Sequence, residues 1–267
     1  MTPILLTWPD LALASVLLLA YGGLSVWLRL GLHRRLAFAA TRMVVQLIAV
    51  GLVLRAVFAI ANPLVTLGVI LAMVAVAARE VAARPEQRLQ RRGNLAVGAS
   101  AVAFATFLTA VLALTTAIRP SPWYDPRYAV PLSGMILGNV LNGASLALDA
   151  LLSGVARGRA AIEAQLCLGA PIRQAMRPFV RDAVRRALLP IVNTMSAAGV
   201  VTLPGIMTGQ ILAGMDPLEA AKYQILIIFL LAGGSGLAAV AVTVLAARRL
   251  TDGHHRLRLD RLEAGRG

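Results

Sequence analysis

The chain has 267 residues, of which 58% are hydrophobic and 14% are charged, and its mean hydropathy is +0.76. Soluble domains carry about 25% charged residues, so this composition excludes an ordinary soluble protein. A net charge of +14 would favour nucleic acid binding in a soluble chain. In a membrane protein, basic residues instead mark the cytoplasmic face, so we expect no nucleic acid partner.

Seven apolar runs are long enough to cross the hydrocarbon core of a bilayer as helices, which takes about 20 residues each. The runs do not alternate apolar and polar residues, which excludes a closed barrel. The sequence therefore predicts an all-α polytopic membrane protein lying in the lipid bilayer. The predicted spans are 10–28, 37–57, 62–79, 93–117, 129–155, 188–213 and 221–247.

The distribution of basic residues predicts the orientation of these spans. Of the 26 Lys and Arg residues, 22 lie in the connections after the first, third and fifth spans or in the C-terminal tail. Basic residues flanking spans concentrate on the cytoplasmic side. We therefore expect the N-terminus outside the membrane and the C-terminus in the cytoplasm.

A ten-residue phrase occurs twice, as GMILGNVLNG at 134–143 and GIMTGQILAG at 205–214. Glycines four residues apart lie on one helix face and permit close helix packing. This packing role is one interpretation, and we expect the two phrases to form facing surfaces beside a pathway. The candidate packing or hinge residues are Gly134, Gly138, Pro204, Gly205 and Gly209, with Pro204 predicting a kink or break in the sixth span.

Polar side chains within these spans favour a second interpretation, a translocation pathway. A carboxamide in the apolar zone needs a partner and commonly faces the bundle interior or a wet cavity. Four polar or sulfur-bearing residues of the fifth span fall within one stripe about 80° wide, and more lie in the sixth span. The candidate pathway residues are Met135, Asn139, Asn142, Asp149, Asn193, Thr202, Met207, Thr208 and Gln210.

The connection at 157–187 is the longest predicted soluble element. IEAQLCLGAP predicts a short helix ended by Gly169 and Pro171, and a second helix is expected to start near Pro178. Arginines recur there every four residues, at 173, 177, 181 and 185. Like charges at this spacing destabilise an isolated helix, so we expect lipid phosphates or acidic residues of a partner to face them.

The chain carries no sequence for binding ATP. A P-loop needs G-x-x-x-x-G-K-[ST], in which the lysine reaches the terminal phosphates. The single lysine, Lys222, lies in AAKYQ instead. We expect no cofactor in this chain, and any ATP hydrolysis would occur on a partner.

Several stretches together resemble one known family. PLSGMILGNVLNGASLALD, LGAP, RRALLPIVNTM and GVVTLPGIMTGQILAGMDPLEAAKYQI are similar to the FetB-like permeases of bacterial iron-export ABC transporters, a family that includes plant aluminium-sensitivity permeases. RMVVQLIAVGLVL also resembles the second span of that family. Ile206-Met207 replaces a Met-Met pair that is common there.

The resemblance implies a permease subunit that exports iron or another metal across the bacterial cytoplasmic membrane. It also implies a homodimer and a separate ABC ATPase. From the predicted spans we expect one transmembrane domain at 1–250 with a cytoplasmic tail at 251–267. The loop at 157–187 resembles the ATPase-coupling loop of ABC permeases, which carries Glu-Ala-Ala followed by Gly. The coupling residues implied are Glu163, Gly169, Arg173, Arg177 and Arg181.

Two other functions remain open on the sequence. A self-contained channel or secondary transporter would need no ATPase, but it leaves the arginine pattern without a purpose. An intramembrane enzyme is suggested by GGSG at 233–236, yet the histidine that such chemistry needs has no later span to occupy. No histidine lies in a predicted span, so a chelated metal fits better than a tight metal site; metal ligands stay unassigned, although His254 and His255 could bind a metal in the tail.

Overall fold

The computed structural model describes residues 7–60, 62–90, 93–122, 124–252 and 256–264. Its architecture is helical, as predicted. The helices are α1 (Trp8–Trp27), α2 (His33–Ile60), α3 (Pro63–Ala83), α4 (Gly93–Leu112), α5 (Pro126–Arg157), α6 (Arg159–Cys167), α7 (Ile172–Ala197), α8 (Gly205–Leu212) and α9 (Pro217–Arg249). A π-helical segment, η1 (Ala113–Ile118), continues α4, and η2 (Leu259–Arg261) is a short 3-10 turn in the tail.

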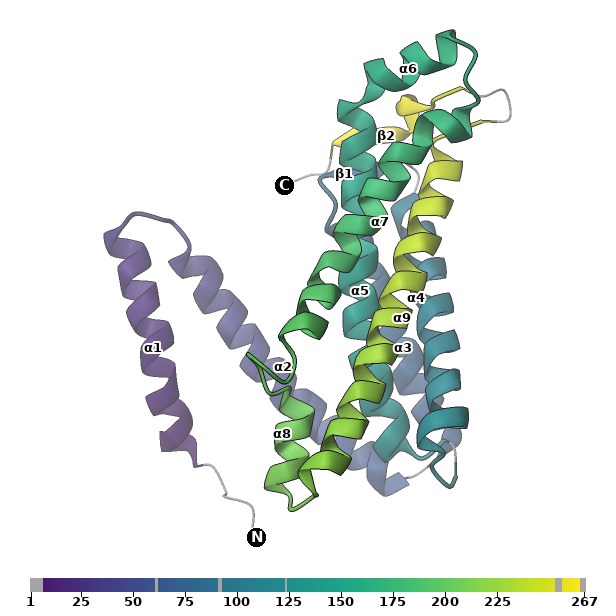
Figure 1. The fold of residues 1–267 in the computed structure, drawn as a ribbon. Helices are drawn as coiled ribbons and strands as arrows, with labels where there is room; N and C mark the ends of the chain where they lie inside the picture. The colour runs from purple at the N-terminus through teal and green to yellow at the C-terminus, as the bar shows by residue number, and fades with distance from the viewer. Residues whose placement is uncertain (1–6, 61, 91–92, 123, 253–255, 265–267) are drawn as a thin grey trace.

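Helices α5 and α9 form the centre of a bundle that α3, α4 and α7 complete (Figure 1). Small residues bring the two central helices close together. A Cβ atom on Gly143 of α5 would lie 3.2 Å from the backbone oxygen of Ser235, and one on Gly234 of α9 would lie 3.3 Å from Cγ2 of Val140. Small residues allow such close approach of helices in lipid, where packing rather than water exclusion drives association.

Helices α1 and α2 stand apart from this bundle in Figure 1, and most of their apolar side chains are exposed. Among the described residues, six helices are long and apolar enough to cross a membrane: α1 to α5, with α4 extended through Thr116 of η1, and α9. The N- and C-terminal ends of the described chain lie at opposite ends of the molecule (Figure 1). This arrangement is compatible with the predicted topology, whose orientation stays a prediction.

The predicted sixth span is not one helix. Helix α7 ends at Ala197, and α8 begins only at Gly205. Between them Gly199 has φ +83° and donates its N–H to the oxygen of Thr202 at 2.9 Å, and Pro204 caps α8. The predicted sixth span, 188–213, is therefore divided between the end of α7 and α8. The break expected near Pro204 is confirmed, but it starts earlier because Gly199 takes a left-handed conformation there.

Helix α7 also begins earlier than expected. It starts at Ile172, directly after Pro171, and contains Pro178 in its interior. The left-handed turn at Gly169 ends α6, so the chain can enter a new helix at once. A proline inside a helix removes one hydrogen bond, but α7 buries apolar residues such as Met176 against the bundle, and this packing keeps it continuous.

The tail folds back onto the bundle. Strand β2 (Leu262–Ala264) pairs antiparallel with β1 (Gln87–Leu89), which follows α3. Arg258 donates to both carboxylate oxygens of Asp260 at 2.8 Å, and this hydrogen bonding keeps the pKa of that carboxyl below its usual value. His254 and His255, the tail residues considered as possible metal ligands, lie outside the described residues.

Candidate translocation pathway and coupling surface

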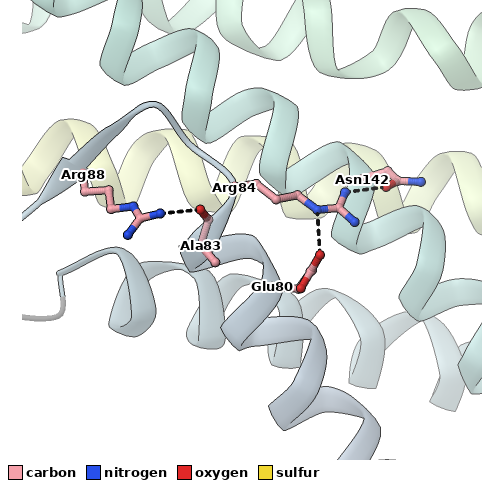
Figure 2. A network of polar contacts seen from close by, with 5 residues as sticks. All are labelled: Glu80, Ala83, Arg84, Arg88 and Asn142. Carbon is pink, nitrogen blue, oxygen red and sulfur yellow. Dashed lines mark hydrogen bonds and ion pairs between the residues drawn. The ribbon is translucent and has the colours of Figure 1, made fainter. Parts of the chain in front are cut away.

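In the C-terminal half of the polar stripe on α5, Asn142 and Asp149 make hydrogen bonds to the end of α3 and the segment that follows it. Oδ1 of Asn142 accepts a hydrogen bond from Arg84 at 3.0 Å, and Arg84 also pairs with Glu80 at 3.4 Å (Figure 2). Oδ1 of Asp149 accepts the backbone N–H of Glu86 at 2.9 Å. These two candidate residues therefore anchor the connection after α3, and Asp149 lies beside a connection that we predict to be cytoplasmic.

In the N-terminal half of the stripe, Met135 and Asn139 make no hydrogen bond to another helix among the described residues. Met135 and Asn139 are half-buried, and Nδ2 of Asn139 donates to the backbone oxygen of Met135 at 3.1 Å within its own helix. A Cβ on Gly134 would lie 3.1 Å from the methyl group of Met73, so this glycine packs on α3. A Cβ on Gly138 would meet no atom within 4 Å.

The second glycine phrase forms α8, which packs on α9. Cβ atoms on Gly205 and Gly209 would meet no described atom within 4 Å. Met207 is half-buried, and the Thr208 hydroxyl donates to the backbone of its own helix at 3.2 Å. Oε1 of Gln210 is buried without a hydrogen-bond partner among the described residues. The open glycine faces mean that the two phrases do not pack on each other within one chain.

The remaining pathway candidates flank the break between α7 and α8. Asn193 is exposed on the last turns of α7. Thr202 is exposed in the turn, where its hydroxyl donates to the oxygen of Ala197 at 3.4 Å. Broken helices at membrane depth are tolerated where they line a cavity or are covered by protein. The break and its polar residues are therefore suited to a pathway wall.

Arginines line the first half of α7, which runs along the side of the bundle (Figure 1). Arg173, Arg177, Arg181 and Arg185 are all exposed, and among the described residues none has an ion-pair partner. The last three line an open concavity of about 1040 Å³ on α7. The sequence predicted a helix here that starts only near Pro178. The four-residue arginine spacing begins at Arg173 and continues into the apolar segment, and this was the signal for one helix from Ile172.

The depth of these arginines follows from the neighbouring helix. The uncharged run of α9 covers 25 residues, 223–247, and Arg248 follows it. That run is about 37 Å long, enough to cross the hydrocarbon core. A Cβ on Gly236 of α9 would lie 3.9 Å from Leu188 of α7. The stretch of α7 just before Leu188 therefore lies beside the C-terminal half of the apolar run of α9, which we predict to be the cytoplasmic half.

Helix α6 lies across the end of the bundle (Figure 1). Only Ile162 of this helix is buried, whereas Leu168, just after it, is 87% exposed. Glu163 pairs with Arg159 at 2.8 Å on the exposed surface, and Gly169 ends the helix with φ +86°. The short helix predicted here is confirmed, and its exposed face and leucine tip form a surface suited to a partner protein.

Comparison with known proteins assigns the family. Residues 8–251 match the model of an uncharacterised protein family, UPF0014. The chain belongs to this family. A UPF0014 membrane protein of Synechocystis sp. is 41% identical over 255 residues, covering 94% of this chain and 96% of the relative.

Two further UPF0014 relatives carry names that describe a role. The probable iron export permease protein FetB of Escherichia coli is 31% identical over 97% of both chains. Protein ALUMINUM SENSITIVE 3 of Arabidopsis thaliana is 31% identical over 89% of this chain and 84% of its own length. No solved structure matches this chain. The resemblance to FetB-like permeases is confirmed, and the chain is a multi-pass membrane protein of a permease family.

Proposed function

We propose that this chain is the membrane-spanning subunit of an ABC exporter in the bacterial cytoplasmic membrane, driven by a separate ATPase. The observation that carries the proposal is the pairing of a transverse, exposed α6 with a discontinuous sixth crossing in one UPF0014 chain. A transverse helix gives a partner protein a rigid docking surface. A discontinuous helix beside a pathway can change conformation during transport.

A wet cavity beside α7 explains the placement of the arginines. Arg181 and Arg185 follow Arg177 by four and eight residues, which places them about 6 and 12 Å further along the helix, beside the inner half of the bundle. Snorkelling can rescue an arginine near the interface, but a deeper one is costly in lipid. We infer that this face borders water, in a cavity closed by a second copy of the chain.

The pathway that we propose runs along this wall to the break between α7 and α8. The open faces of Gly138, Gly205 and Gly209 would meet the second copy, because nothing described within this chain covers them. The pathway residues proposed are Met135, Asn139, Asn193, Thr202, Met207, Thr208 and Gln210. Asn142 and Asp149 would act by holding the end of α3 in place.

An arginine wall disfavours a bare cation, so we propose that the metal crosses as an anionic complex. Among the described residues no three His, Cys, Asp or Glu side chains gather into a potential metal site. The name of FetB supports iron as the metal. A positively charged cavity concentrates anions, which is the charge that a carboxylate-chelated metal would carry.

The test is to uncouple transport at α6. Glu163→Lys reverses a charge on the proposed docking face, and Gly169→Pro cannot adopt the φ of +86° at the end of α6. We expect each variant to insert normally but to lose about tenfold or more of both metal export and permease-stimulated ATP hydrolysis. Export is measured in inverted vesicles that contain the permease and its ATPase.

Matched controls are available on other connections of the chain. Gly31→Pro also forbids a positive φ, here +69°, and Glu86→Lys makes the same charge reversal in the connection after α3. Both should leave ATPase stimulation within about twofold of wild type. Cys167, the only cysteine, is exposed at the end of α6, so its maleimide labelling should fall when the ATPase docks. Survival of export and stimulation in the α6 variants would refute the coupling assignment.

A further inference from the structure

Two grooves meet at Arg248, near the cytoplasmic end of α9. The first, of about 590 Å³, lies between α7 and α9 and is bordered by Arg173, Arg177 and Arg248 over an apolar floor that includes Met176 and Val244. Asp252 is the acidic residue at its edge. The groove thus combines three guanidinium groups with an apolar base.

The second groove, of about 790 Å³, runs between α4 and α9 and shares Val244 and Arg248 with the first. Its other residues are uncharged and nearly all apolar, with Phe104 of α4 on one side and α9 down to Gly236 on the other. The twelve residue steps from Gly236 to Arg248 cover about 18 Å of helix. This length is close to half the hydrocarbon thickness of about 30 Å.

We propose that these grooves bind one anionic phospholipid of the cytoplasmic leaflet. Its phosphate would lie among Arg173, Arg177 and Arg248, none of which has an ion-pair partner among the described residues. An acyl chain would follow the α4–α9 groove down to Gly236. Basic pockets between membrane helices on the cytoplasmic side are suited to acidic head groups. The site requires neither the ATPase nor the proposed export function.

The groove geometry favours a lipid over an acidic protein segment. Arg248 follows the apolar run of α9 directly and lies between the two grooves, so a ligand held there continues into an apolar channel. A lipid satisfies both parts with one molecule, because its phosphate is covalently joined to chains that need apolar cover. An acidic peptide would satisfy the arginines alone and leave the α4–α9 groove empty.

The test measures lipid retention by the purified full-length chain with native mass spectrometry. Delipidated protein is incubated with equal amounts of phosphatidylglycerol and phosphatidylcholine, and bound copies are counted. We expect preferential retention of phosphatidylglycerol. The double variant Arg177→Gln, Arg248→Gln should weaken phosphatidylglycerol binding roughly 30-fold, because each arginine near an anionic head group contributes about 1 kcal/mol. Ala241→Trp, which fills the α4–α9 groove, should weaken it with all arginines present.

The control removes the same number of charges from α7 at positions outside both grooves. Arg181→Gln with Arg185→Gln should retain phosphatidylglycerol within about twofold of wild type, and Arg177→Lys with Arg248→Lys should keep most binding. Equal retention of both lipids, equal loss in the control, or displacement by millimolar inorganic phosphate would overturn the proposal. So would a double variant that keeps the lipid but no longer binds the ATPase, since its arginines would then contact protein. Monodisperse elution checks that each variant is folded.

Discussion

Asn142 and Asp149 differ from the other polar residues of α5 because both hold the segment that follows α3. Their partners are the Arg84 guanidinium, at 3.0 Å, and the backbone N–H of Glu86, at 2.9 Å. Asp149 is half-buried but Glu86 is exposed, so losing the acceptor removes the net stabilisation of one hydrogen bond, whereas a substitution that keeps an oxygen there retains it. A residue chosen for a pathway can thus have an anchoring role.

Two substitutions of Asp149 separate these roles. Asp149→Ala removes the acceptor of the Glu86 N–H and should lower the free energy of unfolding by about 1 kcal/mol, the net contribution of a typical hydrogen bond. Asp149→Asn keeps a carbonyl oxygen in the same place and should change it by less than about 0.5 kcal/mol, within the range of ordinary surface changes. Denaturation of the purified protein in detergent measures both. Equal stability losses would argue against the anchor, and a loss of export in the Asn variant at full stability would assign the charge to the pathway.

At the scale of elements, the two glycine phrases have different partners. Gly143, the last glycine of the first phrase, lies against the backbone of Ser235, and Gly134 lies against α3. Gly138 and the glycines of α8 at 205 and 209 face open space. The repeat therefore does not describe two matching surfaces within one chain. It combines internal packing with faces that we propose meet a second copy.

A matched pair of substitutions tests that division. Gly143→Leu places its Cβ about where Ser235 already lies, and overpacking of this kind costs about 1–3 kcal/mol or more. We expect a lower unfolding temperature and a lower yield of folded monomer. The Cβ of Gly138→Leu would meet no described atom within 4 Å. We therefore expect this variant to leave monomer stability unchanged while shifting the monomer–dimer equilibrium, measured by light scattering in detergent. A Gly138 variant that destabilises the monomer equally would contradict the assignment.

Most of the helices could be predicted because hydrocarbon demands long uncharged runs, as in α9. The course of α7 could not, since its first half is charged and its packing depends on small buried residues such as Ala183 on one face. The pairing of β1 with β2 could not be predicted either, because Leu262 pairs with Leu89, which is distant in the sequence. The site was predicted only in part: the polar residues were identified, but not which of them find partners inside the fold.

At the scale of the whole molecule, the structure has two surfaces that a single chain does not cover. One is the arginine face of α7 with the open glycines of α8, and the other is the exposed face of α6 across the end of the bundle. Helices α1 and α2 also leave most of their apolar surface to lipid or to another subunit. In the complex that we propose, the second copy would cover the first surface and the ATPase the second.

The measurement that tests this account most directly is affinity purification of the chain from its native membranes in mild detergent, with co-purifying proteins identified and quantified by mass spectrometry. The account predicts an ATPase with a P-loop, in about equal amount to this chain and lost when Glu163→Lys or Gly169→Pro is introduced. Repeated recovery of this chain alone under the same gentle conditions would contradict the account and favour a transporter or channel that works without ATP.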